Sequence, residues 1–235
     1  MPVGPAVAAP STFVATSAPS STTMPDGRAA QLIDLGAPGG AALLARISAE
    51  LPGATEAVTA FWGPQWPAEV LIAVAGTPDQ FATLAGGGTD VAATTTADRI
   101  MFAPGATAMN DADLRMVLRH ELFHYAARAD TAADAPMWLT EGVADFVGRP
   151  ASASPPSTLS RRLPTDAELA AAGPDRSAAY DRAWSFATYI ADTYGIDGLR
   201  ALYRQACGHG HPDFATAVRG ALGAELPAVL AGWSR

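Results

Sequence analysis

Two histidines and a glutamate stand at a spacing that can hold and use a metal ion. The string His120-Glu121-Leu122-Phe123-His124 places two imidazoles four residues apart. On an α-helix, side chains four residues apart lie on one face, so both imidazoles can bind the same ion. Glu121 lies beside that face, where a carboxylate can take a proton from a metal-bound water without being a ligand itself. The pattern predicts a zinc ion held by His120 and His124, with Glu121 as the general base that activates the zinc-bound water.

A second segment supplies the rest of the predicted site. A catalytic zinc ion usually has three protein ligands and one open position for water. The segment 137–146, MWLTEGVADF, offers Glu141, and the connector 125–135 lets a second helix turn back against the first. Asp145 follows one helical turn later and can accept the outer N–H of a ligand histidine. An acid pair at this spacing is also common on solvated helix faces, but its apolar flanks favour Glu141 as the third zinc ligand and Asp145 as its support.

The strings HELFH and WLTEGVADF together resemble the gluzincin zinc metallopeptidases of the MA clan, and most closely the short bacterial "peptidase MA-like" domains. The resemblance is specific between about residues 99 and 148 and looser elsewhere. It implies hydrolysis of peptide bonds in peptides or proteins, one zinc ion per chain, and the roles given above for the ligands, the base and Asp145. It also implies that an edge strand, here within 91–103, pairs with the extended backbone of the substrate.

The chain departs from the larger members of that clan in two ways. The separation between His124 and Glu141 is shorter than in the zinc aminopeptidases or thermolysin, so the linking loop must be tighter. The Gly-x-Met-Glu-Asn string, which in the aminopeptidases marks the pocket for a substrate N-terminus, is absent from the sequence. Two alternatives to a peptidase stay open: a zinc-binding module with this fold but no turnover, and a zinc hydrolase acting on a non-peptide substrate.

Peptide hydrolysis also needs a donor to the oxyanion that forms on the substrate carbonyl. We expect this donor to be Tyr180, because it begins the helix after the third ligand and resembles the aminopeptidase tyrosine in its order along the chain. A packed tyrosine is the ordinary alternative. His209 and His211 flank a glycine and precede a proline, which favours an exposed loop over a second metal site. We expect Cys207 to be packed and inert.

Composition limits the possible classes of protein. The 235 residues are 49% hydrophobic and 16% charged, which is typical of a globular chain. The net charge of −8 argues against nucleic acid as a partner. No apolar run approaches eighteen residues, so no transmembrane segment is expected. All 15 basic residues are arginine, which together with abundant alanine, glycine and proline is typical of GC-rich genes such as those of actinobacteria. The sequence does not indicate an oligomeric state.

The order of the elements predicts an α+β fold, with a small, mostly antiparallel sheet in the N-terminal half and a helical C-terminal half that carries the ligands. Strands are expected at 58–62 and 70–75, and a strand pair or one bent edge strand at 91–96 and 99–103. Helices are expected at 41–51, from 110–113 to about 128, and from Pro136 to about 148. After a loop at 151–164, further helices are expected at 178–193, 198–207, 214–222 and 227–233.

The first 27 residues consist mainly of proline, alanine, serine and threonine, which predicts a flexible linker. Residues 28–235 are predicted to form a single metallopeptidase domain, with a strand-rich part at 28–110 and a helical part at 111–235. Linkers of this composition often follow an export signal or an envelope anchor, although the first ten residues lack the pattern of a signal peptide. We therefore expect an extracellular or cell-envelope protein.

Overall fold

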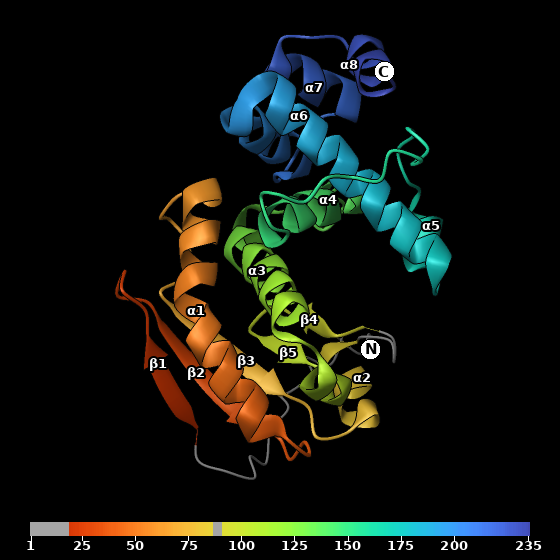
Figure 1. The fold of residues 1–235 in the computed structure, drawn as a ribbon. Helices are drawn as coiled ribbons and strands as arrows, with labels where there is room; N and C mark the ends of the chain where they lie inside the picture. Colours follow the sequence, from red (N-terminus) through yellow and green to blue (C-terminus); the bar gives the residue numbers. More distant parts are fainter. Residues whose placement is uncertain (1–18, 87–90) are drawn as a thin grey trace, which may run out of the picture.

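A five-stranded mixed sheet forms the N-terminal half of the molecule (Figure 1). The computed structural model describes residues 19–86 and 91–235. The sheet has the order β1-β2-β3-β5-β4, in which the two inner pairs, β2 with β3 and β3 with β5, are parallel and the two outer pairs are antiparallel. The strands are Ser20–Thr23 (β1), Ala29–Asp34 (β2), Glu69–Val74 (β3), Ala93–Thr95 (β4) and Ile100–Phe102 (β5).

The predicted α+β class is confirmed, but the sheet is mixed rather than mostly antiparallel. The reason lies in the connections. Helix α1 (Gly40–Trp62) links β2 to β3, and helix α2 (Pro78–Ala85) lies on the path from β3 to β5. Parallel neighbours need such a crossover connection, whereas antiparallel neighbours can be joined by a short turn.

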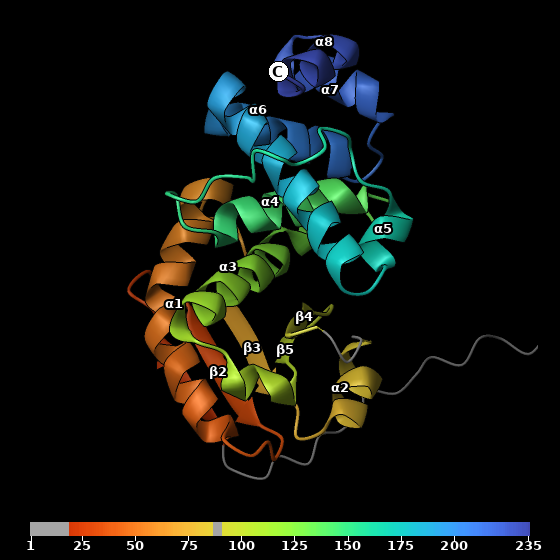
Figure 2. The ribbon, with the colours of Figure 1, turned by 45° about the vertical axis from the view of Figure 1, so that its right-hand side comes forward.

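Helices cover both faces of the sheet. The main core lies between one face and the helices α1 and α3 (Asp111–Ala127), where Ile72 and Val74 of the central strand are fully buried. The intervening residue Ala73 points to the other face and packs with Phe81 of α2 and Met101 in a smaller cluster. Figures 1 and 2 show α1 and α3 on one side of the sheet and α2 on the other. This alternation along β3 is the period of two that a strand buried on both faces requires.

Helix α1 corrects the prediction of a short helix at 41–51 followed by a strand at 58–62. The structure has one helix of 23 residues, and Pro52 and Gly53 lie inside it without ending it. Its buried residues continue at helical spacing across the proline, because Ala54 and Val58 follow Leu51 on the same face. The β-branched residues near 58 are therefore the buried face of a helix.

The segment predicted as a linker, residues 1–27, does not stay outside the fold. Its C-terminal part belongs to the sheet. Residues 1–18 lie outside the described part of the chain, but Ser20–Thr23 form β1 and pair with β2. In addition, Thr22 contributes a side-chain hydrogen bond to Ser48 of α1, with the two hydroxyl oxygens 2.6 Å apart. Strand β2 and helix α2 were not predicted.

The C-terminal half is helical, as predicted. Helix α4 packs across the long helix α6, and α7 and α8 lie at the far end of the molecule (Figure 2). The helices predicted at 178–193 and 198–207 lie within α6, which is interrupted at Gly195 by a backbone φ of 79°. Within the described residues no single helix is long and apolar enough to cross a membrane; α7 and α8 meet those two criteria only as a pair, bent by 81°. The helices are α4 (Met137–Gly148), α5 (Asp166–Ala170), α6 (Pro174–Cys207), α7 (Phe214–Leu222) and α8 (Leu226–Trp233), and the 3₁₀ turns are Pro104–Ala108 and Arg128–Asp130.

Candidate metal centre

Helix α3 places the two histidines on one face. The helix begins after Asn110, whose side chain accepts a hydrogen bond from the backbone N–H of Asp113 and so caps the first turn. Leu114, Leu118 and Leu122 form its buried face and fix its rotation against the core. As a result the rings of His120 and His124 lie with their centroids 4.8 Å apart and their Nε2 atoms 3.1 Å apart.

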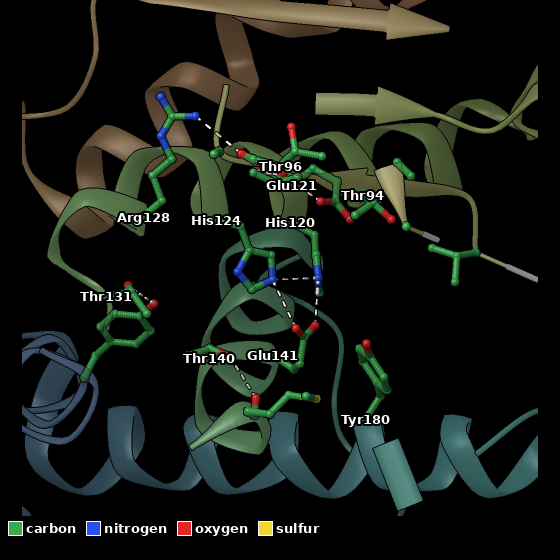
Figure 3. Close-up of a pocket in the computed structure, with 17 residues that line it drawn as sticks. Thr94, Thr96, His120, Glu121, His124, Arg128, Thr131, Thr140, Glu141 and Tyr180 are labelled. Atoms are coloured by element: carbon green, nitrogen blue, oxygen red, sulfur yellow. Dashed lines mark hydrogen bonds and ion pairs between the residues drawn. The ribbon is translucent and has the colours of Figure 1, made fainter. Parts of the chain in front are cut away.

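Helix α4 brings Glu141 to the same point. The connection from α3 is short: a 3₁₀ turn at Arg128–Asp130 is followed by a backbone hydrogen bond from Ala132 to Cys207 of α6. Glu141 Oε2 lies 3.2 Å from His120 Nε2, and Oε1 lies 3.5 Å from His124 Nε2. Figure 3 shows the two imidazoles and this carboxylate pointing toward one another.

The three side chains fit a zinc ion. One possible ligand atom from each of His120, His124 and Glu141 lies within 4.8 Å of the other two. Ligand atoms about 2.0–2.1 Å from a tetrahedral zinc ion lie roughly 3.4 Å from one another. The two Nε2 atoms are 3.1 Å apart, and each lies 3.2 or 3.5 Å from a different oxygen of Glu141, so the three groups are close enough together to share one such ion.

Asp145, predicted as a supporting carboxylate, lies against the first histidine. Its Oδ1 lies 2.9 Å from His120 Nδ1. Because an ionised carboxylate only accepts hydrogen bonds, Nδ1 carries a hydrogen, and Nε2 is the nitrogen that could bind a metal ion once its own proton is lost. Asp145 is itself held by Arg149, whose Nη2 lies 2.7 Å from Oδ2 and 3.0 Å from Asp181 of α6.

Sequence reasoning missed the contribution of Arg149 and Asp181. Arg149 also lies over the ring of Trp184, with its guanidinium carbon 4.1 Å from the ring centroid. The four-residue spacing from Asp145 to Arg149 was a usable signal, because such a pair faces one side of a helix. The partnership with Asp181 depends on the packing of α4 on α6 and has no local signal.

The electrostatics of the site favour a cation at its centre. Burial opposes protonation of His120, but its hydrogen bonds to Asp145 and Glu141 outweigh burial and raise its pKa well above the usual value. For Glu141 burial acts in the opposite direction and would raise the pKa. The neighbouring His124 and His120 outweigh burial and lower the pKa of Glu141 below its usual value. Glu141 therefore stays ionised, as a metal ligand must.

A cleft runs past these residues. Its larger lobe, of about 710 Å³, is lined by the predicted ligands, Glu121, Tyr180 and the edge strand β4. A second lobe, of about 300 Å³, shares His120, Glu121 and Tyr180 with the first and continues toward Asp181. Glu121 is only 8% exposed and lies between the ligands and β4, next to Thr94 and Thr96 in Figure 3. The edge strand predicted within 91–103 therefore lies along the cleft, as β4.

Tyr180 lies beside the predicted ligands. Its ring centroid is 6.4 Å from that of His120, and it is directed toward Glu141 in Figure 3. Burial and the negative charge of Glu141 raise the pKa of its phenol well above the usual value, so the hydroxyl keeps its proton and can donate.

The other candidate residues lie away from the cleft. His209 is exposed, with Nε2 3.1 Å from the carbonyl oxygen of Ala129, and His211 lies 3.5 Å from Asp134. Neither lines either lobe of the cleft. Cys207 is fully buried in the main core, and burial raises the pKa of its thiol to about 12.

Comparison with protein-family models gives no match, and comparison with curated proteins gives none either. Among solved structures, the chain is similar to Legionella pneumophila aminopeptidase A, crystallised in complex with aspartic acid, with a TM-score of 0.59 and 14% sequence identity. The match covers 93% of this chain but only 28% of that chain. At this identity the likeness shows a shared fold.

Proposed function

We propose that this protein is a zinc-dependent peptidase of the gluzincin type. The observation that carries the proposal is the convergence of His120, His124 and Glu141, whose ligand atoms lie close enough together to share one metal ion, with Glu121 beside them in the same cleft. The fold likeness to an aminopeptidase supports the class of peptidase. We do not extend the proposal to aminopeptidase activity, because the string that marks the N-terminal pocket is absent from the sequence.

The chain supplies the groups that peptide hydrolysis requires. A bound zinc ion would supply Lewis acidity, which acidifies water and polarises a carbonyl group. The carboxylate of Glu121 accepts the proton of the attacking water and delivers it to the leaving amine. The protonated phenol of Tyr180 donates a hydrogen bond to the developing oxyanion. Asp145 keeps His120 in the tautomer that leaves Nε2 free to bind.

The edge of the sheet supports an extended peptide as the substrate. β4 is the last strand of the sheet and lines the cleft. Backbone hydrogen bonds join Thr96 to Arg99 and Ala103 to Ala92, so by alternation Ala93 and Thr95 are the non-hydrogen-bonded positions opposite β5. Their N–H and C=O groups point away from β5, toward the free edge, which pairs with no other strand among residues 19–86 and 91–235. A peptide can add there as a further strand, which requires no particular side chains.

Metal content and hydrolysis test the proposal together. Purified protein should contain about one zinc per chain and should cleave members of a mixed peptide library. The variant Glu121→Gln should keep the zinc and lose about 10²–10⁴-fold in kcat, since general-base catalysis contributes that much. A variant that cleaves peptides as fast as the parent would rule out Glu121 as the base. Zinc binding without cleavage of any peptide would favour a binding module or a hydrolase of other substrates.

A further inference from the structure

A threonine of the edge strand holds the proposed base. Thr95 Oγ1 lies 2.7 Å from Glu121 Oε2 and 2.9 Å from the backbone oxygen of the same residue. The two residues are 26 positions apart in the sequence, and they meet because β4 packs against the middle of α3. Glu121 is largely buried at this contact.

The hydroxyl has one proton, and the carboxylate is the stronger acceptor. Hydrogen bonds to an ionised acceptor are shorter and roughly twice as strong as those between neutral groups. The shorter of the two distances is the one to the carboxylate oxygen, which agrees with this choice. With Oε2 bonded to Thr95, the orientation of the Glu121 carboxyl group is fixed, and Oε1 has no hydrogen-bond partner among the described residues. Oε1 is therefore the oxygen left to accept a proton.

The same residue also forms part of the free edge. The side chain of Thr95 points to α3, whereas its backbone N–H and C=O face away from β5. Thr95 thus lies between the strand edge at which a peptide backbone would bind and the carboxylate that would act on it.

We propose that Thr95 is a positioning residue, whose hydroxyl holds one oxygen of Glu121 so that the other faces the reacting water. This inference rests on the proposed function. Misplacement of a catalytic group by about 1 Å can cost as much as 10²-fold in rate. Loss of the hydroxyl should therefore lower kcat while leaving zinc binding and the strand edge in place.

The first test compares variants that keep the hydroxyl of residue 95 with variants that lack it. Thr95→Val and Thr95→Ala should bind zinc as the parent does, should have KM within about threefold, and should lose about 10–100-fold in kcat. Thr95→Ser, which keeps the hydroxyl, should recover most of that loss. Thr22→Val is the matched control, because Thr22 makes an equivalent strand-to-helix hydroxyl contact on β1, at the opposite edge of the sheet. A folded Thr95→Ser that is as slow as Thr95→Ala would overturn the inference, as would parental kcat in both Thr95→Val and Thr95→Ala.

The second test does not require peptide hydrolysis. Acetohydroxamate binds zinc as an anion and gives up a proton that a neighbouring carboxylate accepts. Its affinity for the zinc-loaded protein, measured by calorimetry, should fall about tenfold in Thr95→Ala and at least as far in Glu121→Gln, but not in Thr95→Ser. If the parent cleaves no peptide and this order of affinities still holds, the proposed function fails and the role of Thr95 stands. Equal affinities in Thr95→Ala and Thr95→Ser would remove that role, whatever the substrate.

Discussion

Tyr180 shows how one residue can serve both the structure and the proposed chemistry. It lies near the start of α6, close to His120, and its burial and the negative charge of Glu141 raise the pKa of its phenol, which therefore stays protonated. Tyr180→Phe keeps the ring and its packing but removes the donor. We expect the variant to bind zinc normally and to lose about 10²–10³-fold in kcat, which is the usual cost of removing an oxyanion donor.

A second tyrosine of the same helix provides the control. Tyr194 lines neither lobe of the cleft, so Tyr194→Phe should keep parental kcat. Steady-state kinetics on one cleaved peptide give kcat for the parent and the two variants, and zinc analysis gives their metal content. If Tyr180→Phe and Tyr194→Phe are equally active, the oxyanion donor is another group.

Individual residues differ in how far the sequence reveals them. His120, Glu121 and His124 belong to one helical turn, so their spacing alone predicts that they lie together. The prediction of Glu141 depended on a second helix that brings it to the histidines. Pro136 and the apolar residues around Glu141 indicated such a helix. Thr95 could not be recognised in this way, since nothing local relates a short polar strand to a helix 26 residues later. The same holds for Asp181, which joins the site through the crossing of α4 and α6.

At the scale of elements, local signals were sufficient where a helix carried its own cap. Helix α3 begins after its predicted cap, Asn110, whereas the helix predicted from Pro136 begins one residue later, at Met137, and has no side-chain cap. Strand β1 was missed because its sequence, SSTT, has no apolar face, and only its pairing with β2 makes it a strand. Helix α1 was divided in the prediction because Pro52 and Gly53 resemble a stop, whereas burial of the residues on both sides keeps the helix continuous.

The crossing of α4 and α6 depends on the glycine that follows Glu141 in the sequence. A Cβ at Gly142 would lie 2.5 Å from the carbonyl oxygen of Ala183, closer than such atoms approach. Gly142→Ala should therefore destabilise the fold by about 1–3 kcal/mol, the usual cost of overpacking. It should also weaken zinc binding, because the helices must separate where Glu141 is held. Chemical denaturation and zinc titration measure the two effects.

The control for this prediction is a helical glycine with space around it. A Cβ at Gly53, inside α1, would meet only Arg119 Nη2 at 3.9 Å. Gly53→Ala should therefore stabilise the protein by about 0.5–1 kcal/mol, because alanine loses less conformational freedom in a helix. Equal stabilities of the two variants would contradict the close approach of α4 and α6.

At the scale of the whole molecule, the candidate metal site joins a helix that packs on the sheet to a helix that packs on α6. His120 and His124 come from α3, which packs on the sheet, and Glu141 comes from α4, which packs on α6. A metal ion bound by all three would stabilise the native state only, because the unfolded chain does not bring the ligands together. At a zinc concentration of about 100 times Kd this adds about 2.7 kcal/mol, which for a chain of this size raises Tm by roughly 5–10 °C.

The stabilisation by zinc should depend on pH in a direction that His120 sets. The hydrogen bonds of His120 to Asp145 and Glu141 raise its pKa in the folded protein above that of an unfolded chain, about 6.5. Without zinc, the protonated imidazole therefore stabilises the fold fully below pH 6.5, and this contribution is lost as the pH rises through the folded pKa. Zinc needs the neutral imidazole, so protons compete with the metal at low pH. The difference in Tm between protein with zinc and protein with chelator should be small at pH 5.5 and should widen steadily toward pH 8.5.

Thermal unfolding at four pH values in this range, with excess zinc or with chelator, measures that difference. His120→Ala should remove most of it at every pH, because a ligand is lost together with the group that titrates. His209→Ala, which changes an exposed histidine outside the cleft, should leave the widening unchanged. A difference in Tm that is the same at pH 5.5 and pH 8.5 would mean that His120 does not titrate against the metal. A stabilisation by zinc that survives in His120→Ala would place the ion elsewhere on the molecule.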